Sequence, residues 1–209
     1  MADNYLERKM EDLRRGNLAN HAARRAQSRR GYLSFAFPPK RVLIALEPSL
    51  LQQSIIDTFL KVDCKVALMD SDAERGKQLA YEQGIRYYHS CGCEAIFSNL
   101  ISVWREVNIV ICDSVMAAEF SELWERQLSK LHIPSEYGGR LIVLNQSEDK
   151  EVNYDCQSIH VMLGKFGITV NRISLAAGGE NEKETAEKIS RLIAFLSLSG
   201  NEFINGIIF

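Results

Sequence analysis

The stretch Lys40–Asp70 constrains the fold more than any other part of the chain. It opens with an apolar run, Val42–Leu46, that is too short for a helix and rich enough in branched residues for a buried strand. A helical pattern follows, with apolar residues spaced i, i+4, i+8 and i+11 at Leu51, Ile55, Phe59 and Val62. A second strand, Val66–Met69, leads directly to an acid, Asp70. Strand, helix, strand and acid predict the first half of a doubly wound parallel sheet.

This stretch resembles the opening of the short-chain dehydrogenase/reductase family without a gap. Counting back from Asp70, the family's T-G-x-x-x-G-x-G falls on Ala45, Leu46, Leu50 and Gln52, so all three glycines are replaced. In the family these glycines form a tight turn and let helix amides approach a pyrophosphate. We expect the side chains of Leu46 and Leu50 to fill that space instead. We also expect residues 49–52 to form a capping box, in which the helix satisfies its own first amides.

Two further residues bear on a cofactor. Glu47 lies in the same turn, and at about 4 Å and an effective dielectric constant near 20 it would cost roughly 4 kcal/mol against each phosphate charge. In the family, an acid at the position of Asp70 hydrogen-bonds the adenosine ribose and favours NAD over NADP. Asp70 is therefore the candidate cofactor-binding residue, and NAD is the candidate cofactor if one binds. Two alternatives stay open: a cofactor loop of unusual sequence, or a purely structural turn in which Asp70 precedes a capping box begun by Ser71.

The rest of the chain continues the alternation of strands and helices. Gly84 ends the helix that follows Asp70. Further strands are predicted at Ile85–Tyr88, Asn108–Cys112, Arg140–Leu144, Gly167–Ile173 and Phe203–Phe209, with helices at about 94–104, 116–131, 148–165 and over Ile189–Leu196. The segments GGRLIVL and GITVN resemble the family's fifth and sixth strands. The resemblance covers residues 40–209 and implies a single Rossmann-like α/β domain of about seven strands in the order 3-2-1-4-5-6-7.

The family's catalytic pattern is not reproduced. Its Tyr-x-x-x-Lys pair needs both side chains on one helix face. Taking Tyr154 as the tyrosine places Ser158 at the lysine position. Counting back from Gly167 instead places Asn145 at the tyrosine position and Asp149 at the lysine position. Lys150 lies four residues before Tyr154, in the reverse order, and Ser147 could replace the catalytic serine, so these three are the weak catalytic candidates. An unassisted tyrosine, with a pKa near 10, is a poor base at neutral pH.

Two other family features are altered. The N-N-A-G motif at the end of the fourth strand is replaced by Cys112, Asp113, Ser114 and Val115. The substrate lid after the sixth strand is reduced to a few residues around Gly178–Lys183.

Composition limits the partners. The net charge of -2 gives no general case for nucleic-acid or membrane binding. Residues 1–39 form a distinct extension, in which 1–31 carry eight bases against four acids, a net charge of +4. Such an arm could bind nucleic acid or an acidic partner, but more often it lies over its own domain or a neighbouring subunit, or is disordered. Five cysteines without an apparent signal peptide predict reduced thiols in the cytoplasm. Cys91-Gly-Cys93 lacks the paired spacing of a metal site.

Three functions remain. The first is a degenerate family member without dehydrogenase chemistry, a pseudoenzyme that acts through binding or assembly as a homo-oligomer or beside a related dehydrogenase subunit. The amphipathic helix at 116–131, which forms the dimer interface in the family, gives some support to a dimer, although packing on the sheet explains its apolar stripe equally well. The second is an NAD(P)-dependent oxidoreductase with a non-standard active site, and the third is a protein that binds another small ligand in the vacated cleft.

Overall fold

The computed structural model describes residues 39–89, 92–131, 138–145, 156–175, 182–198 and 204–206. The chain divides after Ala36 into two units, and all the described residues belong to the second, Phe37–Phe209. The predicted basic extension, 1–39, lies outside the described residues except for its last position. In the described part of the chain, no helix is long and apolar enough to cross a membrane.

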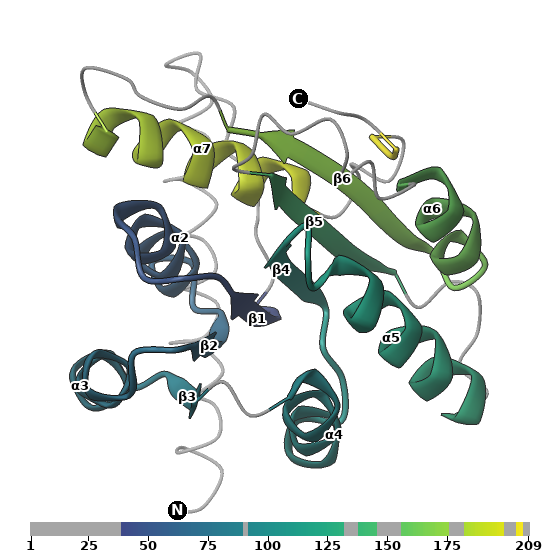
Figure 1. The fold of residues 1–209 in the computed structure, drawn as a ribbon, viewed down its shortest axis with the longest axis horizontal. Coiled ribbons are helices and arrows are strands. Elements are labelled where there is room, and N and C mark those ends of the chain that lie inside the picture. The colour runs from purple at the N-terminus through teal and green to yellow at the C-terminus, as the bar shows by residue number, and fades with distance from the viewer. Residues whose placement is uncertain are drawn as a thin grey trace, which may run out of the picture. The chain divides into compact units, whose positions relative to one another are not determined.

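The described residues build a parallel sheet of six strands in the order β3-β2-β1-β4-β5-β6 (Figure 1). The strands are β1 (Arg41–Ala45), β2 (Lys65–Asp70), β3 (Arg86–His89), β4 (Ile109–Asp113), β5 (Gly139–Asn145) and β6 (Ile168–Ser174). The predicted Rossmann-like α/β fold is confirmed, with this order for the first six strands. Of the predicted seventh strand, only residues 204–206 are described. They lie beside β6, where Gly206 N donates to Val170 O at 2.8 Å and Asn205 Oδ1 accepts from Val170 N at 2.8 Å.

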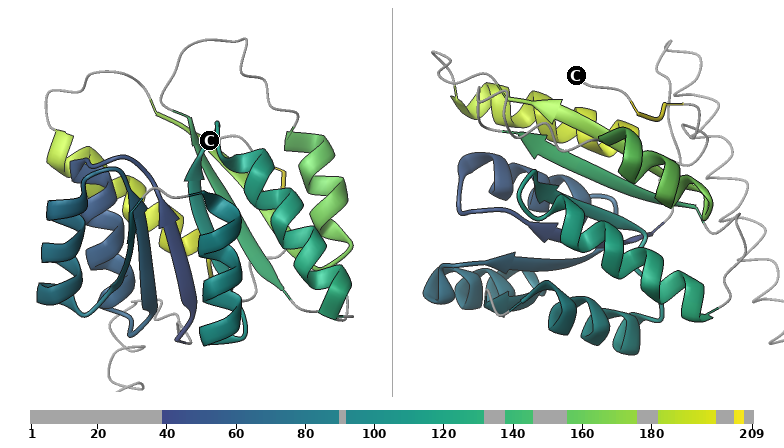
Figure 2. Two further views of the ribbon diagram at one scale, coloured as in Figure 1. Left: turned by 60° about the horizontal axis from the view of Figure 1, so that its bottom comes forward. Right: turned by 45° about the vertical axis from the view of Figure 1, so that its right-hand side comes forward.

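Helices cover both faces of the sheet (Figure 2). Those on one face are α2 (Leu50–Leu60), α3 (Ala73–Gln83) and α7 (Glu182–Leu196), and those on the other are α4 (Cys93–Trp104), α5 (Ala117–Leu131) and α6 (Cys156–Gly164). Successive strand residues point to opposite faces. In β1, Val42 and Ile44 therefore join the core under α2 and α7, whereas Leu43 and Ala45 join the core under α4 and α5.

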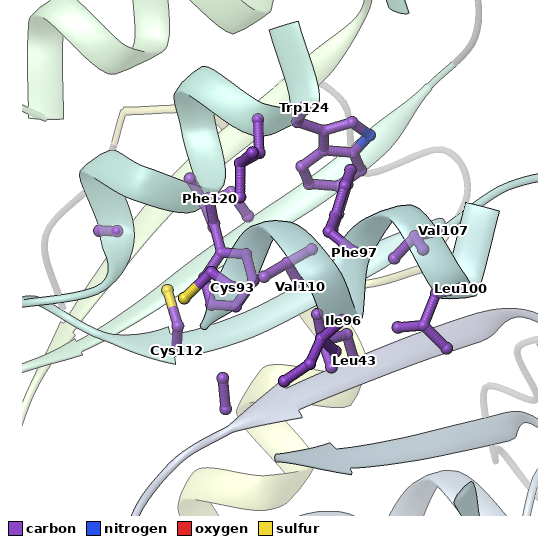
Figure 3. Packing of buried hydrophobic residues seen from close by; sticks show 14 of the residues in the cluster. Leu43, Cys93, Ile96, Phe97, Leu100, Val107, Val110, Cys112, Phe120 and Trp124 are labelled. Atoms are coloured by element: carbon purple, nitrogen blue, oxygen red, sulfur yellow. The ribbon is translucent and has the colours of Figure 1, made fainter. Parts of the chain in front are cut away.

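Aromatic rings pack against one another in the otherwise mainly aliphatic core beneath α4 and α5 (Figure 3). The ring of Phe97 lies 6.3 Å from that of Phe120 and 6.1 Å from that of Trp124, within the range of favourable aromatic pairs. Phe120 and Trp124 are completely buried against the chain's own sheet. The apolar stripe of α5 is therefore explained by this core and gives no separate support for a dimer.

The helix ends show where local prediction holds. Ser49 caps α2 by accepting from Gln52 N at 3.1 Å, and Gly84 ends α3 in the left-handed conformation (φ 68°), both as predicted. The cap predicted for α3 is wrong, because Asp72 and not Ser71 accepts from Arg75 N, at 3.0 Å. Aspartate is as good a cap as serine. Ser71 donates instead to Glu47 Oε2, at 2.6 Å.

Arg140, the first residue of the predicted fifth strand and part of β5, anchors the end of α7. Its guanidinium is buried and donates to Leu196 O at 3.3 Å and to Leu198 O at 3.1 Å. Lys40 Nζ donates to Ser197 O at 2.7 Å. Two cations thus satisfy the carbonyls at the negative end of the helix dipole.

Candidate functional site

The turn between β1 and α2 lies at the carboxyl edge of the sheet, where ligands bind in doubly wound folds. The strand ends at Ala45, and the next residue, Leu46, is buried in the core on the α2 side. Glu47 is exposed, and Leu50, the first residue of α2, is 56% exposed. The structure thus buries Leu46 and exposes Leu50, and the expectation that both fill the place of the family's pyrophosphate stays a prediction.

Gln52 stands in the third glycine position and is completely buried. Its Nε2 donates to Leu46 O at 2.7 Å and to Asp70 Oδ2 at 3.2 Å. The predicted capping box is thus only half formed. The Ser49 hydroxyl caps the helix as expected, but the carboxamide of Gln52 points into the interior and not back to the Ser49 amide.

Asp70, the candidate cofactor-binding residue, ends β2 with its side chain fully buried. Oδ1 accepts from Asp72 N at 3.1 Å. Oδ2 accepts from Gln52 Nε2 and from Arg75 Nη1, both at 3.2 Å. Burial raises the pKa of Asp70 above its ordinary value, and the hydrogen bond from Gln52, the charge of Arg75 and the Asp72 amide oppose that rise.

Arg75 closes this group of side chains from the first turn of α3. The same Nη1 that pairs with Asp70 also donates to Gln52 Oε1. The Arg75 side chain remains 28% exposed, whereas the Asp70 carboxylate has no exposed surface. We call these three residues the Gln52–Asp70–Arg75 cluster. It joins α2, β2 and α3 through charge-assisted hydrogen bonds in a buried setting.

The end of β4 is also tied into the fold. Asp113 Oδ1 accepts from Met116 N at 2.9 Å, just before α5 begins. Ser114 N donates to Leu144 O at 3.1 Å, and Ser114 Oγ lies 3.5 Å from Asn145 Oδ1. The residues in place of the N-N-A-G motif thus connect β4 to β5 and to α5, apart from Val115, which is 76% exposed.

Two thiols lie beneath this edge, one on α4 and one on β4. Cys93 and Cys112 are free and buried (Figure 3). Burial, followed by a hydrogen bond to the Glu119 carboxylate, raises the pKa of Cys93 to about 12. Burial likewise raises the pKa of Cys112 well above its ordinary value, with smaller contributions from Asp113 and Cys93. Such thiols are weak nucleophiles, because the thiolate is the reactive form.

The other predicted site residues are not placed. Tyr154, Ser147 and Lys150 all lie outside the described residues, as does Cys91. Within the described residues, no group of three histidine, cysteine or acidic side chains gathers to hold a metal ion. At this edge, the described side chains offer a buried acid that is already hydrogen-bonded and a turn without glycine.

Comparison with known proteins identifies the fold and nothing finer. No protein-family model and no curated protein matches the chain. Among solved structures, a variant of ElxO with NADPH bound superposes with a TM-score of 0.66 at 13% identity, over 82% of this chain and 96% of that chain. A short chain dehydrogenase from Mycobacterium smegmatis gives 0.66 at 10% identity, over 85% and 93%. A 3-ketoacyl-(acyl-carrier-protein) reductase from Brucella melitensis complexed with NADH gives 0.60 at 12%, over 82% and 96%.

Proposed function

We propose that this chain is a short-chain dehydrogenase/reductase-like protein that has lost dehydrogenase activity and acts through binding or assembly. The fold is that of the dehydrogenases it superposes on. In this proposal the fold serves as a scaffold, because the same fold can carry unrelated functions when its site changes.

The observation that carries the proposal is the state of Asp70. Gln52, Arg75 and the Asp72 amide already take three of the roughly four lone-pair sites of this carboxylate. The carboxylate also has no exposed surface. A ribose could reach Asp70 only by displacing at least one of these donors, and a buried donor left unpaired costs about 1–3 kcal/mol.

The turn between β1 and α2 is unfavourable for the pyrophosphate of a dinucleotide. Leu46 places a buried side chain in the position of the first family glycine, where the backbone would have to approach a pyrophosphate. Glu47 adds a negative charge next to the start of α2, and its carboxylate is held by Ser71. These residues do not fit a dinucleotide bound in the usual pose.

The alternative is an NAD(P)-dependent oxidoreductase with a non-standard site. It is favoured by two of the superposed proteins, one with NADPH bound and one complexed with NADH. Its catalytic residues would be Tyr154, Ser147 and Lys150. A different small ligand in the vacated cleft is less well supported, because Gln52 already occupies part of that space.

The proposal includes a cytoplasmic location and a homo-oligomeric state, or association with a related dehydrogenase subunit. The free, buried thiols Cys64, Cys93 and Cys112 are compatible with a reducing compartment. Deleting residues 1–31 tests whether the basic arm takes part in assembly. We expect light scattering to show loss of the oligomer, whereas unchanged association would assign the arm to another partner.

Calorimetric titration of the purified full chain with NAD, NADH, NADP and NADPH tests the proposed function. We expect no binding in the submillimolar range, because the Asp70 carboxylate is fully buried and already hydrogen-bonded to Gln52, Arg75 and the Asp72 amide. Submillimolar binding of any of the four would favour the oxidoreductase instead.

A further inference from the structure

The Gln52 carboxamide makes the contacts that a bound polar ligand would make. It donates from Nε2 to Leu46 O and to Asp70 Oδ2, and it accepts at Oε1 from Arg75. All of its partners lie on other segments of the fold, and none lies within α2 itself. A glutamine on the buried face of a helix usually costs stability unless its polar atoms are satisfied. Here all the hydrogen-bond partners of the carboxamide, Leu46 O, Asp70 and Arg75, lie at the carboxyl edge of the sheet.

Without this side chain, the same place would hold two acceptors and one donor. The acceptors are the Asp70 carboxylate and Leu46 O, and the donor is the Arg75 guanidinium. A vicinal diol complements this set, because each hydroxyl can donate one hydrogen bond and accept others. An apolar ligand would leave Leu46 O and Asp70 Oδ2 without the hydrogen bonds that Gln52 gives them, while Arg75 and the Asp72 amide would still donate to Asp70.

We propose that Gln52 is an internal ligand that stands in for a vicinal diol and keeps Asp70 closed to external polyols such as a ribose. This inference rests on the proposed function and adds to it the residue responsible for the closure. It also names the chemical class that the opened site would accept.

Gln52 and Arg75 differ in their contribution to the closure. Gln52 is completely buried, whereas the Arg75 side chain is 28% exposed and can turn into solvent. Removing Arg75 would leave the Gln52 carboxamide on Asp70 and Leu46 O. The inference therefore predicts that a change at Gln52 opens the site and that a change at Arg75 does not.

The test compares Gln52→Gly and Gln52→Ala with Arg75→Ala and with a matched control, Gln53→Gly. Gln53 neighbours Gln52 on α2 but donates to Asp57, so its replacement imposes the same helix cost without touching Asp70. The alanine variant keeps the test available if glycine unfolds the chain, and circular dichroism checks the fold of each. The probes are adenosine, which carries a vicinal diol, and dideoxyadenosine, which lacks both hydroxyls.

We expect calorimetry or NMR titration to show adenosine binding to folded Gln52 variants at least about tenfold tighter than to the wild type. Dideoxyadenosine should not show this gain, and Arg75→Ala and Gln53→Gly should behave as the wild type does. If adenosine binding does not improve in either folded Gln52 variant, the inference is wrong, although the proposed function still stands. Equal gains for adenosine and dideoxyadenosine would exclude diol recognition. Tight binding of NAD by the wild type would overturn the proposed function as well.

Discussion

Arg75 Nη1 lies 3.2 Å from Asp70 Oδ2, so a partly exposed guanidinium pairs with a fully buried carboxylate. Pairing of this kind offsets the cost of taking the carboxylate out of water but does not abolish it. Burial still dominates and raises the pKa of Asp70, even with Gln52 and Arg75 opposing it.

The raised pKa of Asp70 predicts a pH dependence of stability. At a pH between the ordinary pKa of about 3.9 and the raised pKa, the folded state binds more protons than the unfolded state. The contribution of Asp70 to the free energy of unfolding therefore falls as the pH rises through this window, and it is constant above the window. Urea unfolding of the wild type and of Asp70→Asn, measured from acidic to neutral pH, isolates the contribution. As the pH rises from about 4, the free energy of unfolding of the wild type should fall relative to that of Asp70→Asn. A difference that is independent of pH, or that shifts the other way, would show that burial does not control this carboxyl.

The two leucines in the glycine positions should differ sharply in their contribution to stability. Leu46 is 3% exposed and packed in the core, whereas Leu50 is 56% exposed. Leu46→Ala should lower the free energy of unfolding by about 2 to 5 kcal/mol. Leu50→Ala should change it by about 0.5 kcal/mol or less. Chemical denaturation of both variants measures the contrast, and equal effects would mean that Leu46 is not packed in the core.

Cys93 and Cys112 should resist alkylation in the folded protein. Both thiols are buried, and the pKa of Cys93 is raised to about 12, so little thiolate is available near neutral pH. Treatment with iodoacetamide, digestion and mass spectrometry should find both residues unmodified in the native chain. Labelling in denaturant provides the control for peptide detection. Rapid native labelling of either residue would contradict this packing.

Much of the fold follows from local patterns. Short branched runs such as Val42–Leu46 predict strands because a helix needs a longer segment, and the structure places β1 within one residue of that run. The caps at Ser49 and Gly84 are equally local. The identity of the α3 cap is less certain from sequence, because Ser71 and Asp72 are adjacent and both are good caps.

The candidate site depends on contacts that no local pattern reveals. Gln52 bonds to Asp70, 18 residues away, and to Arg75, 23 residues away, after the sheet has brought β2 and α3 beside the start of α2. One signal was available. Gln52 lies three and four residues before Ile55 and Ile56, on the same helix face, which places a polar side chain toward the core.

The central claim is that the chain's own side chains occupy the place where a dinucleotide would bind. A crystal structure of the full chain grown in excess NAD tests it most directly. We predict that Gln52 Nε2 remains within hydrogen-bonding distance of Asp70 and that no nucleotide lies across Leu46 and Leu50. Density for an NAD ribose on Asp70, with the Gln52 side chain displaced, would contradict the account.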